Sequence, residues 1–154
     1  MINRIESLPA EDQQILYDAI PYVTILVAGA DGIIDNSELA ASEKVTHVRS
    51  FHYEHEEWMD YYKKADQGLH ERLHELIDQL PRDTEARQSI LSERLRKLNG
   101  VLPKLDHRHA KHFYDGLVSF AHHIAHASGG FIGWLSVDEQ EAKVTDLPMV
   151  KPVK

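Results

Sequence analysis

Three carboxylates lie close together in the stretch AGADGIIDNSE, which follows a long apolar run. Asp31, Asp35 and Glu38 are spaced at i, i+4 and i+7 across a tight turn. Ca²⁺ and Mg²⁺ fill their coordination shells with carboxylates, backbone carbonyls and water. A helix that ends just before this turn leaves its last carbonyls free to serve as ligands. The spacing therefore indicates a hard divalent cation held by oxygen atoms, in a loop that lacks the ligand pattern of an EF-hand.

Helix capping explains most of the same residues without an ion. Gly32 suits the left-handed position that ends a helix. Asp35 followed three residues later by Glu38 is a capping-box-like pair, with both acids near the positive end of the next helix. Capping accounts for every acid in the stretch except Asp31, so the two interpretations stay open.

A weaker copy of this pattern lies near the other end of the chain. There AHASG is followed, after an insert, by Val-Asp-Glu-Gln-Glu, with Asp138 and Glu141 in the places of Asp35 and Glu38. Ser128 stands where the first copy has Asp31, so the second set has one carboxylate fewer. Helix capping explains Asp138 and Glu141 in the same way as Asp35 and Glu38. The repeated pattern indicates two related helical halves.

The chain also has 11 histidines, whose neutral rings are common ligands for transition metals. His112, His122 and His126 share the polar face of a helix expected after Asp106, and the last two have the i, i+4 spacing of a chelating pair. That face lies opposite the apolar stripe, which favours a surface in contact with solvent or with a partner subunit. His55 falls on the apolar arc of another expected helix, together with His52, which favours a core histidine over a metal ligand.

The string HERLH matches the H-E-x-x-H pattern of zinc proteases, with His70 and His74 as ligands and Glu71 as general base. The surrounding helix is short and exposed, and no sheet is expected that could form a cleft. Because the chain is rich in histidine, a chance match is the favoured explanation. A zinc hydrolase remains the enzymatic alternative.

Apolar residues recur with helical period along the chain, and no segment alternates like a strand. The periodicity predicts helices over residues 11–30, 36–62, 69–80, 84–98 and 106–128, and a short one from Asp138. Pro21 should kink the first helix or begin a second, and Asn99-Gly100 should end the fourth. The sequence therefore predicts an all-α, compact helical bundle, with one domain over residues 1–147 and an extended tail over 148–154.

The amino-acid composition limits the kinds of partner that the protein can bind. The chain has 154 residues, with 17 basic and 25 acidic side chains, and its net charge of −8 opposes binding to nucleic acid. There are no cysteines, so disulfides and thiolate zinc sites are excluded. We expect neither a secretory signal nor a membrane span, because the longest apolar run is well short of the ~20 residues that a bilayer requires. These features predict a cytoplasmic protein.

The pattern ADGIID-x-x-E after a hydrophobic helix, with ASGGFIGWLSVDEQE near the far end, resembles the TerB-like family associated with tellurite resistance. This resemblance implies about seven helices in two pseudo-symmetric halves and a bacterial stress-response setting. It also implies divalent-cation binding at these turns, on Asp31, Asp35 and Glu38 and on Asp138 and Glu141. The family has no established enzymatic activity.

We therefore expect a non-enzymatic adaptor that binds a divalent cation, with Ca²⁺, Mg²⁺ or Mn²⁺ favoured over Zn²⁺. The ion would fix the angle between two helix ends and so change the surface offered to a protein partner. Assembly into a homo-oligomer stays open. The alternatives are an interaction module without an ion, whose acidic face docks a basic partner, and the zinc hydrolase of His70, Glu71 and His74.

Overall fold

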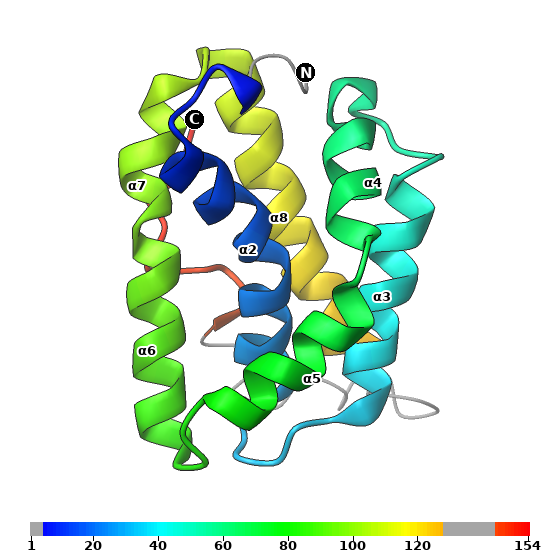
Figure 1. The fold of residues 1–154 in the computed structure, drawn as a ribbon, viewed down its shortest axis with the longest axis vertical. Coiled ribbons are helices and arrows are strands. Elements are labelled where there is room, and N and C mark those ends of the chain that lie inside the picture. Colours follow the sequence, from blue (N-terminus) through cyan, green and yellow to red (C-terminus); the bar gives the residue numbers. More distant parts are fainter. Residues whose placement is uncertain (1–4, 128–143) are drawn as a thin grey trace.

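The computed structural model describes residues 5–127 and 144–154. This part of the chain forms an all-α bundle of six helices, joined by one single-turn helix and two short 3-10 segments, with no strands (Figure 1). The elements are α2 (Ala10–Ala28), α3 (Asn36–Arg49), η1 (Glu56–Trp58), α4 (Met59–Asp66), α5 (Leu69–Gln79), α6 (Thr84–Arg96), α7 (Leu98–Val101), η2 (Leu102–Lys104) and α8 (His107–Ala127). The predicted all-α class is confirmed.

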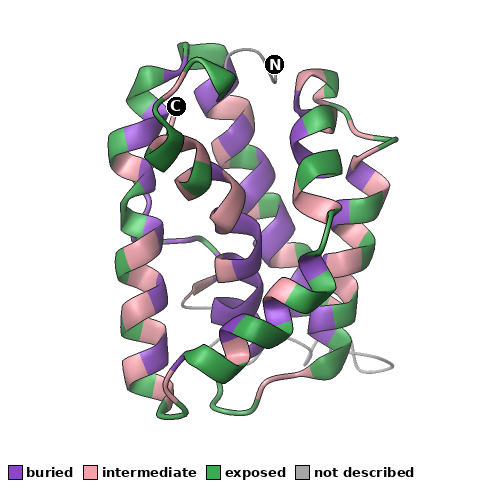
Figure 2. Ribbon diagram, in the orientation of Figure 1, coloured by how far each residue is buried: buried purple, intermediate pink, exposed green. Residues whose placement is uncertain are grey.

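Helix α2 is the central element of the bundle. It packs against α6, α8 and α3, and α5 crosses it obliquely (Figure 1). Figure 2 shows the buried residues concentrated along its C-terminal half, where every residue from Val23 to Ala28 is buried. The helix runs through Pro21 as one element, so the second helix considered at this position does not form. Burial around α2 holds the segment in one helix despite the hydrogen bond that proline removes.

The helix expected over residues 36–62 is broken in two, and the prediction of a continuous helix is wrong. Helix α3 ends at Arg49, and a connection without regular structure leads through Phe51 and His52 to η1 and α4. Phe51 is 61% exposed and His52 is exposed, so neither lies on a buried helical face. The apolar residues after Arg49 happen to keep a helical spacing. The chain nevertheless turns back after α3, so that α4 packs beside α3 (Figure 1).

The second correction concerns Asn99 and Gly100, which lie inside α7 instead of ending a helix. The Asn99 side chain is used elsewhere: its Nδ2 donates to the Met149 carbonyl at 3.0 Å, and its Oδ1 accepts from the Lys151 backbone N–H at 2.7 Å. The start of the short helix expected from Asp138 lies outside the described residues. Within residues 144–154, Leu147, Met149 and Val150 are buried in the main core. Asn99 therefore holds the C-terminal segment against the bundle through two hydrogen bonds.

Helix α8 begins close to the predicted position and continues to Ala127, where the described range ends. Asp106 caps it, since its Oδ1 accepts from the His109 backbone N–H at 2.9 Å. The apolar stripe is buried against α2 and α3, as the pattern Phe113, Leu117, Phe120 and Ile124 predicts. None of the helices in the described ranges is long and apolar enough to cross a lipid bilayer.

Candidate metal centre

One group of three ligand side chains converges where the connection after α3 meets α8. His55 comes from that connection, Glu57 from η1, and His112 from the second turn of α8. One ligand atom from each of the three lies within 4.8 Å of the other two. Within residues 5–127 and 144–154, no other three histidine, aspartate or glutamate side chains converge in this way. The centre joins two elements that are far apart in the sequence.

The three side chains already contact one another. His112 Nδ1 forms a short hydrogen bond with Glu57 Oε1. The rings of His55 and His112 are stacked, with centroids 4.0 Å apart and planes only 12° from parallel. All three are half-buried, with side-chain exposures of 21% for His55, 18% for Glu57 and 24% for His112. An ion can therefore reach them from solvent while losing part of its hydration.

Glu57 is held in its ionised form. Burial raises the pKa of this carboxyl, but the hydrogen bond from His112, a backbone hydrogen bond, and the charges of His112 and Arg108 outweigh it. The pKa of Glu57 therefore lies below its usual value. Arg108 Nη2 is 4.0 Å from Glu57 Oε1, and this exposed arginine adds positive charge to the rim. A carboxylate that keeps its charge is ready to coordinate a cation.

The donor set consists of two imidazole nitrogens and one carboxylate oxygen. Such mixed nitrogen and oxygen ligands suit Zn²⁺ and its first-row neighbours, whereas Ca²⁺ and Mg²⁺ prefer shells made of oxygen. Since the lone pair of an imidazole nitrogen lies in the ring plane, two stacked rings cannot point at one ion. The rings of His55 and His112 would have to tilt apart for both nitrogens to bind one ion, which would displace the proton that His112 and Glu57 share.

A buried arginine fixes the connection that carries His55. Arg49, the last residue of α3, is only 6% exposed. Its Nη1 donates to the Tyr62 hydroxyl at 2.8 Å and to the Gly116 carbonyl at 2.9 Å, and its Nη2 donates to Ser119 Oγ at 3.2 Å. The guanidinium also lies 4.8 Å from the centre of the Tyr53 ring. These contacts tie the end of α3 to α8, close to the candidate metal ligands.

Tyr53 brings the connection directly onto α8. Its hydroxyl lies against Gly116, at the place where any larger residue would put its Cβ. Burial is the main reason that the pKa of Tyr53 is raised, so this hydroxyl stays protonated. The Tyr53 ring packs edge-on against His55, at 5.3 Å between centroids. Gly116 thus gives Tyr53 the room to place His55 beside His112.

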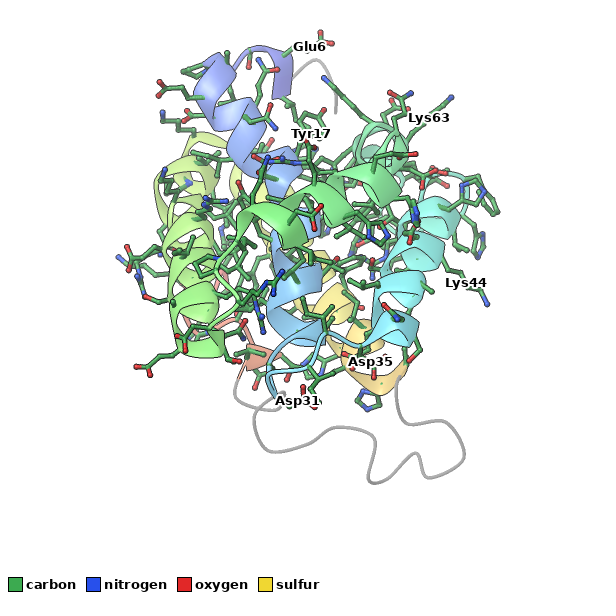
Figure 3. The ribbon with its side chains drawn as sticks, turned by 60° about the horizontal axis from the view of Figure 1, so that its bottom comes forward. Glu6, Tyr17, Asp31, Asp35, Lys44 and Lys63 are labelled. Carbon is green, nitrogen blue, oxygen red and sulfur yellow. The ribbon has the colours of Figure 1, made fainter. Side chains whose placement is uncertain are left out.

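The acidic turn, where a cation was expected, is organised mainly by hydrogen bonds within the chain. Asp35 is the N-cap of α3: its Oδ1 accepts from the backbone N–H groups of Ser37 at 2.9 Å and Glu38 at 3.1 Å. Asp31 is exposed and accepts from the Ile33 backbone N–H at 3.1 Å. Glu38 is fully buried. Figure 3 shows Asp31 and Asp35 at the loop between α2 and α3. The three carboxylates do not converge as the metal centre does.

The expectation that the last carbonyls of the preceding helix are free is wrong. The Ala28 carbonyl accepts from the Asp35 backbone N–H at 3.0 Å. The Gly29 carbonyl accepts from Gly32 N at 3.1 Å and from Arg87 Nη2 at 2.7 Å. Arg87 is buried, so a guanidinium already supplies positive charge at this helix end. Cation binding by Asp31, Asp35 and Glu38 stays a prediction.

Replacing Asp35 by alanine should cost about 1 kcal/mol of stability, because the cap of α3 is lost. Asp31→Ala is the matched control, since Asp31 accepts one hydrogen bond at an exposed turn, and its cost should be clearly smaller. Urea unfolding in metal-free buffer measures both. Equal losses for the two variants would show that Asp35 does not stabilise α3 as its cap.

Other predicted site residues have different places. Asp138 and Glu141 lie outside the described residues. The rings of His122 and His126 do not face one ion, because His122 Nε2 pairs with Asp146 Oδ1 at 2.9 Å and His126 Nδ1 donates to the His122 carbonyl at 2.9 Å. Partial burial, followed by the charges of Arg49, His126 and His122, lowers the pKa of the neighbouring His123.

The HERLH string lies on α5. His70 and His74 are exposed, with their rings 4.6 Å apart at a steep angle. His70 Nδ1 is paired with Glu43 Oε1 of α3 at 3.0 Å. No third ligand joins His70 and His74 among the residues that the structure describes. The geometry gives the zinc-hydrolase alternative no support.

The pattern of the sequence did not reveal the metal centre as a group. His55 and His112 were each considered, but on two separate helices and for different roles, and Glu57 was missed. Glu57 and His112 are 55 positions apart, so no local spacing connects them. The one usable signal was Gly116 in the middle of a helix, which indicates that another part of the chain comes close.

Comparison with known proteins adds no further constraint. No family model, no curated protein and no solved structure matches this chain. Its own side chains therefore carry the functional inference.

Proposed function

We propose that this chain is a non-enzymatic protein that binds a divalent transition-metal ion through His55, Glu57 and His112. The observation that carries this proposal is the convergence of three ligand atoms within 4.8 Å from two separate elements. Their half-burial and the negative charge of the Glu57 carboxylate favour binding of a cation. Zn²⁺ is the ion that the donor set fits best, with Co²⁺, Ni²⁺ and Cu²⁺ as close chemical relatives.

The bound ion would act as a link between the α3–α4 connection and α8. Without the ion, ring stacking, the hydrogen bond between His112 and Glu57 and the ion pair between Arg108 and Glu57 join these elements at the centre. With it, the rings tilt and two histidines are fixed on one ion, which moves the connection that exposes Phe51 and His52. A partner that contacts this connection would bind the two states with different affinity, which is the requirement for an adaptor that responds to a metal.

We propose that the chain is a TerB-like protein and that it binds its metal ion as part of a bacterial response to metal or tellurite stress. Two features support it: the all-α bundle, and the order of an apolar helix, a glycine turn and an Asp35-capped helix. About seven helices in two pseudo-symmetric halves, a cytoplasmic location and a protein partner belong to the same proposal. The acidic turn would be a second cation site in that setting, which calorimetry of Asp31→Ala with Ca²⁺, Mg²⁺ and Mn²⁺ tests.

Titration calorimetry with Zn²⁺ tests the proposal. We expect one ion per chain at the centre, and in His112→Ala an affinity lower by more than about 100-fold, since removal of a ligand should exceed the effect of its outer partners. His126→Ala is the matched control, because His126 lies on the same helix, outside the centre. This control should bind Zn²⁺ as the original chain does.

The rival functions give different results in the same experiment. Zinc lost in His70→Ala but kept in His112→Ala would favour the hydrolase site on α5. No zinc in either the original chain or the variants would favour an interaction module that works without an ion.

A further inference from the structure

Three protein ligands leave a tetrahedral ion with one open position, which water fills in catalytic zinc sites. One more carboxylate lies beside the centre. Glu54 directly precedes His55, and its Oε1 is 3.8 Å from His55 Nε2. Its side chain is 80% exposed, and among the described residues this ion pair with His55 is the only one that Glu54 makes. The carboxylate is therefore free to turn toward an ion bound by His55.

We propose that Glu54 is the fourth ligand and that the ion sits in a closed site of two histidines and two glutamates. This inference rests on the proposed metal binding at His55, Glu57 and His112. A closed site leaves no position at which water could be activated. The ion would therefore fix the α3–α4 connection against α8, and its presence would be sensed through the position of that connection. The non-enzymatic character of the proposed function then follows from the coordination itself.

Charge favours Glu54 as the fourth ligand. A divalent ion with Glu57 as its one carboxylate leaves a net positive charge in a half-buried place, where unpaired charge is costly. Arg108, near Glu57, adds to that positive charge. A second carboxylate makes the ion and its ligands neutral, so that the positive charge of Arg108 is the one that remains beside the centre.

Geometry separates Glu54 from the other nearby glutamate. Glu56 and Glu57 are neighbours in the 3-10 segment η1, where successive side chains are about 120° apart. With Glu57 turned toward His112, Glu56 is turned elsewhere, and it is exposed. Glu54 lies in the irregular connection before η1, where no helical hydrogen bond restricts its rotation. Glu56 is thus a matched control of the same type, two residues away.

Co²⁺ is the probe for the test, because its visible absorption is strong in a tetrahedral site and weak when water adds a fifth or sixth ligand. The original chain and Glu56→Gln should both show the strong tetrahedral spectrum and the same affinity. Glu54→Gln should bind Co²⁺ at least about 10-fold more weakly. Its absorption bands should differ from those of Glu56→Gln, because water or the weaker amide oxygen replaces the carboxylate and further waters can then raise the coordination number.

The outcomes separate the two proposals. A Glu54→Gln variant that matches Glu56→Gln in affinity and spectrum overturns the closed site, while metal binding itself stands. If the original chain binds no Co²⁺, or if His112→Ala binds it unchanged, the metal centre and its fourth ligand are both wrong. Circular dichroism of each variant should show unchanged helix content, because Glu54 and Glu56 are exposed.

Discussion

Replacing Arg49 by methionine should lower the free energy of unfolding by at least about 1.5–3 kcal/mol, the range for a single hydrogen bond that involves a charged group. The variant removes three hydrogen bonds, to Tyr62, Gly116 and Ser119, from a side chain that is 6% exposed. It also leaves the Tyr62 hydroxyl without its buried donor. Methionine fills most of the volume of the arginine side chain. The loss of stability therefore comes mainly from the missing polar contacts and only to a small extent from a cavity.

The position of Arg49 explains why a buried guanidinium is tolerated although no carboxylate of the described residues forms an ion pair with it. It ends α3, where the helix dipole favours a positive charge. The rings of Tyr53, Tyr62 and Phe120 lie 4.8, 5.2 and 5.8 Å from the guanidinium carbon, within the range of cation–π attraction. The cation is therefore stabilised by a dipole, a carbonyl, hydroxyls and aromatic faces together.

Lys44→Met on the same helix is the control for charge removal. Lys44 is exposed, and Figure 3 shows its side chain pointing outward from α3. Urea unfolding should detect little change in this variant. A loss for Arg49→Met no larger than that for Lys44→Met would mean that the contacts of Arg49 do not hold α3 to α8.

Gly116→Ala should cost about 1–3 kcal/mol, as expected when an extra methyl group is forced into a packed interior. The new methyl group would overlap the Tyr53 hydroxyl, and an aromatic ring held by Arg49 and Tyr62 cannot bend away. The connection that carries His55 must then move off α8. Zinc affinity should fall together with stability, although Gly116 is not a ligand.

Gly100→Ala is the control for a glycine replaced within a helix. A Cβ at Gly100 meets no atom within 4 Å, so the substitution should be neutral or stabilising by up to about 1 kcal/mol, since alanine favours helix. Thermal unfolding and zinc titration of both variants give the comparison. Gly116→Ala with unchanged stability and zinc affinity would contradict the role given to the contact between Tyr53 and α8.

Local signals in the sequence were enough to predict most of the helices. Helix α6 begins at Thr84 as predicted, Asp106 caps α8, and the proline at position 81 follows the end of α5. The prediction failed where a long-range contact decided the outcome. Residues 50–55 have apolar spacing that suits a helix, but Tyr53 packs on Gly116 of α8, and no local pattern contains that contact.

The histidines show the same limit. Several of them pair with acids of other elements: His47 with Asp66, His70 with Glu43, His112 with Glu57 and His122 with Asp146. In a chain with 25 acidic and 17 basic residues, histidines serve as partners for surplus carboxylates. Their number alone therefore indicated neither a metal site nor its place. Only the convergence of three ligands separates His55, Glu57 and His112 from the simple pairs.

Amide NMR spectra recorded with substoichiometric Cu²⁺ test the central claim most directly, because a paramagnetic ion broadens first the signals of the residues that it binds. We expect the earliest loss of signal at residues 53–58 and 109–115, which surround His55, Glu57 and His112, and the same residues should shift when Zn²⁺ is added. Broadening that begins at residues 31–38, at His70 and His74, or at His122 and His126 would contradict the metal centre.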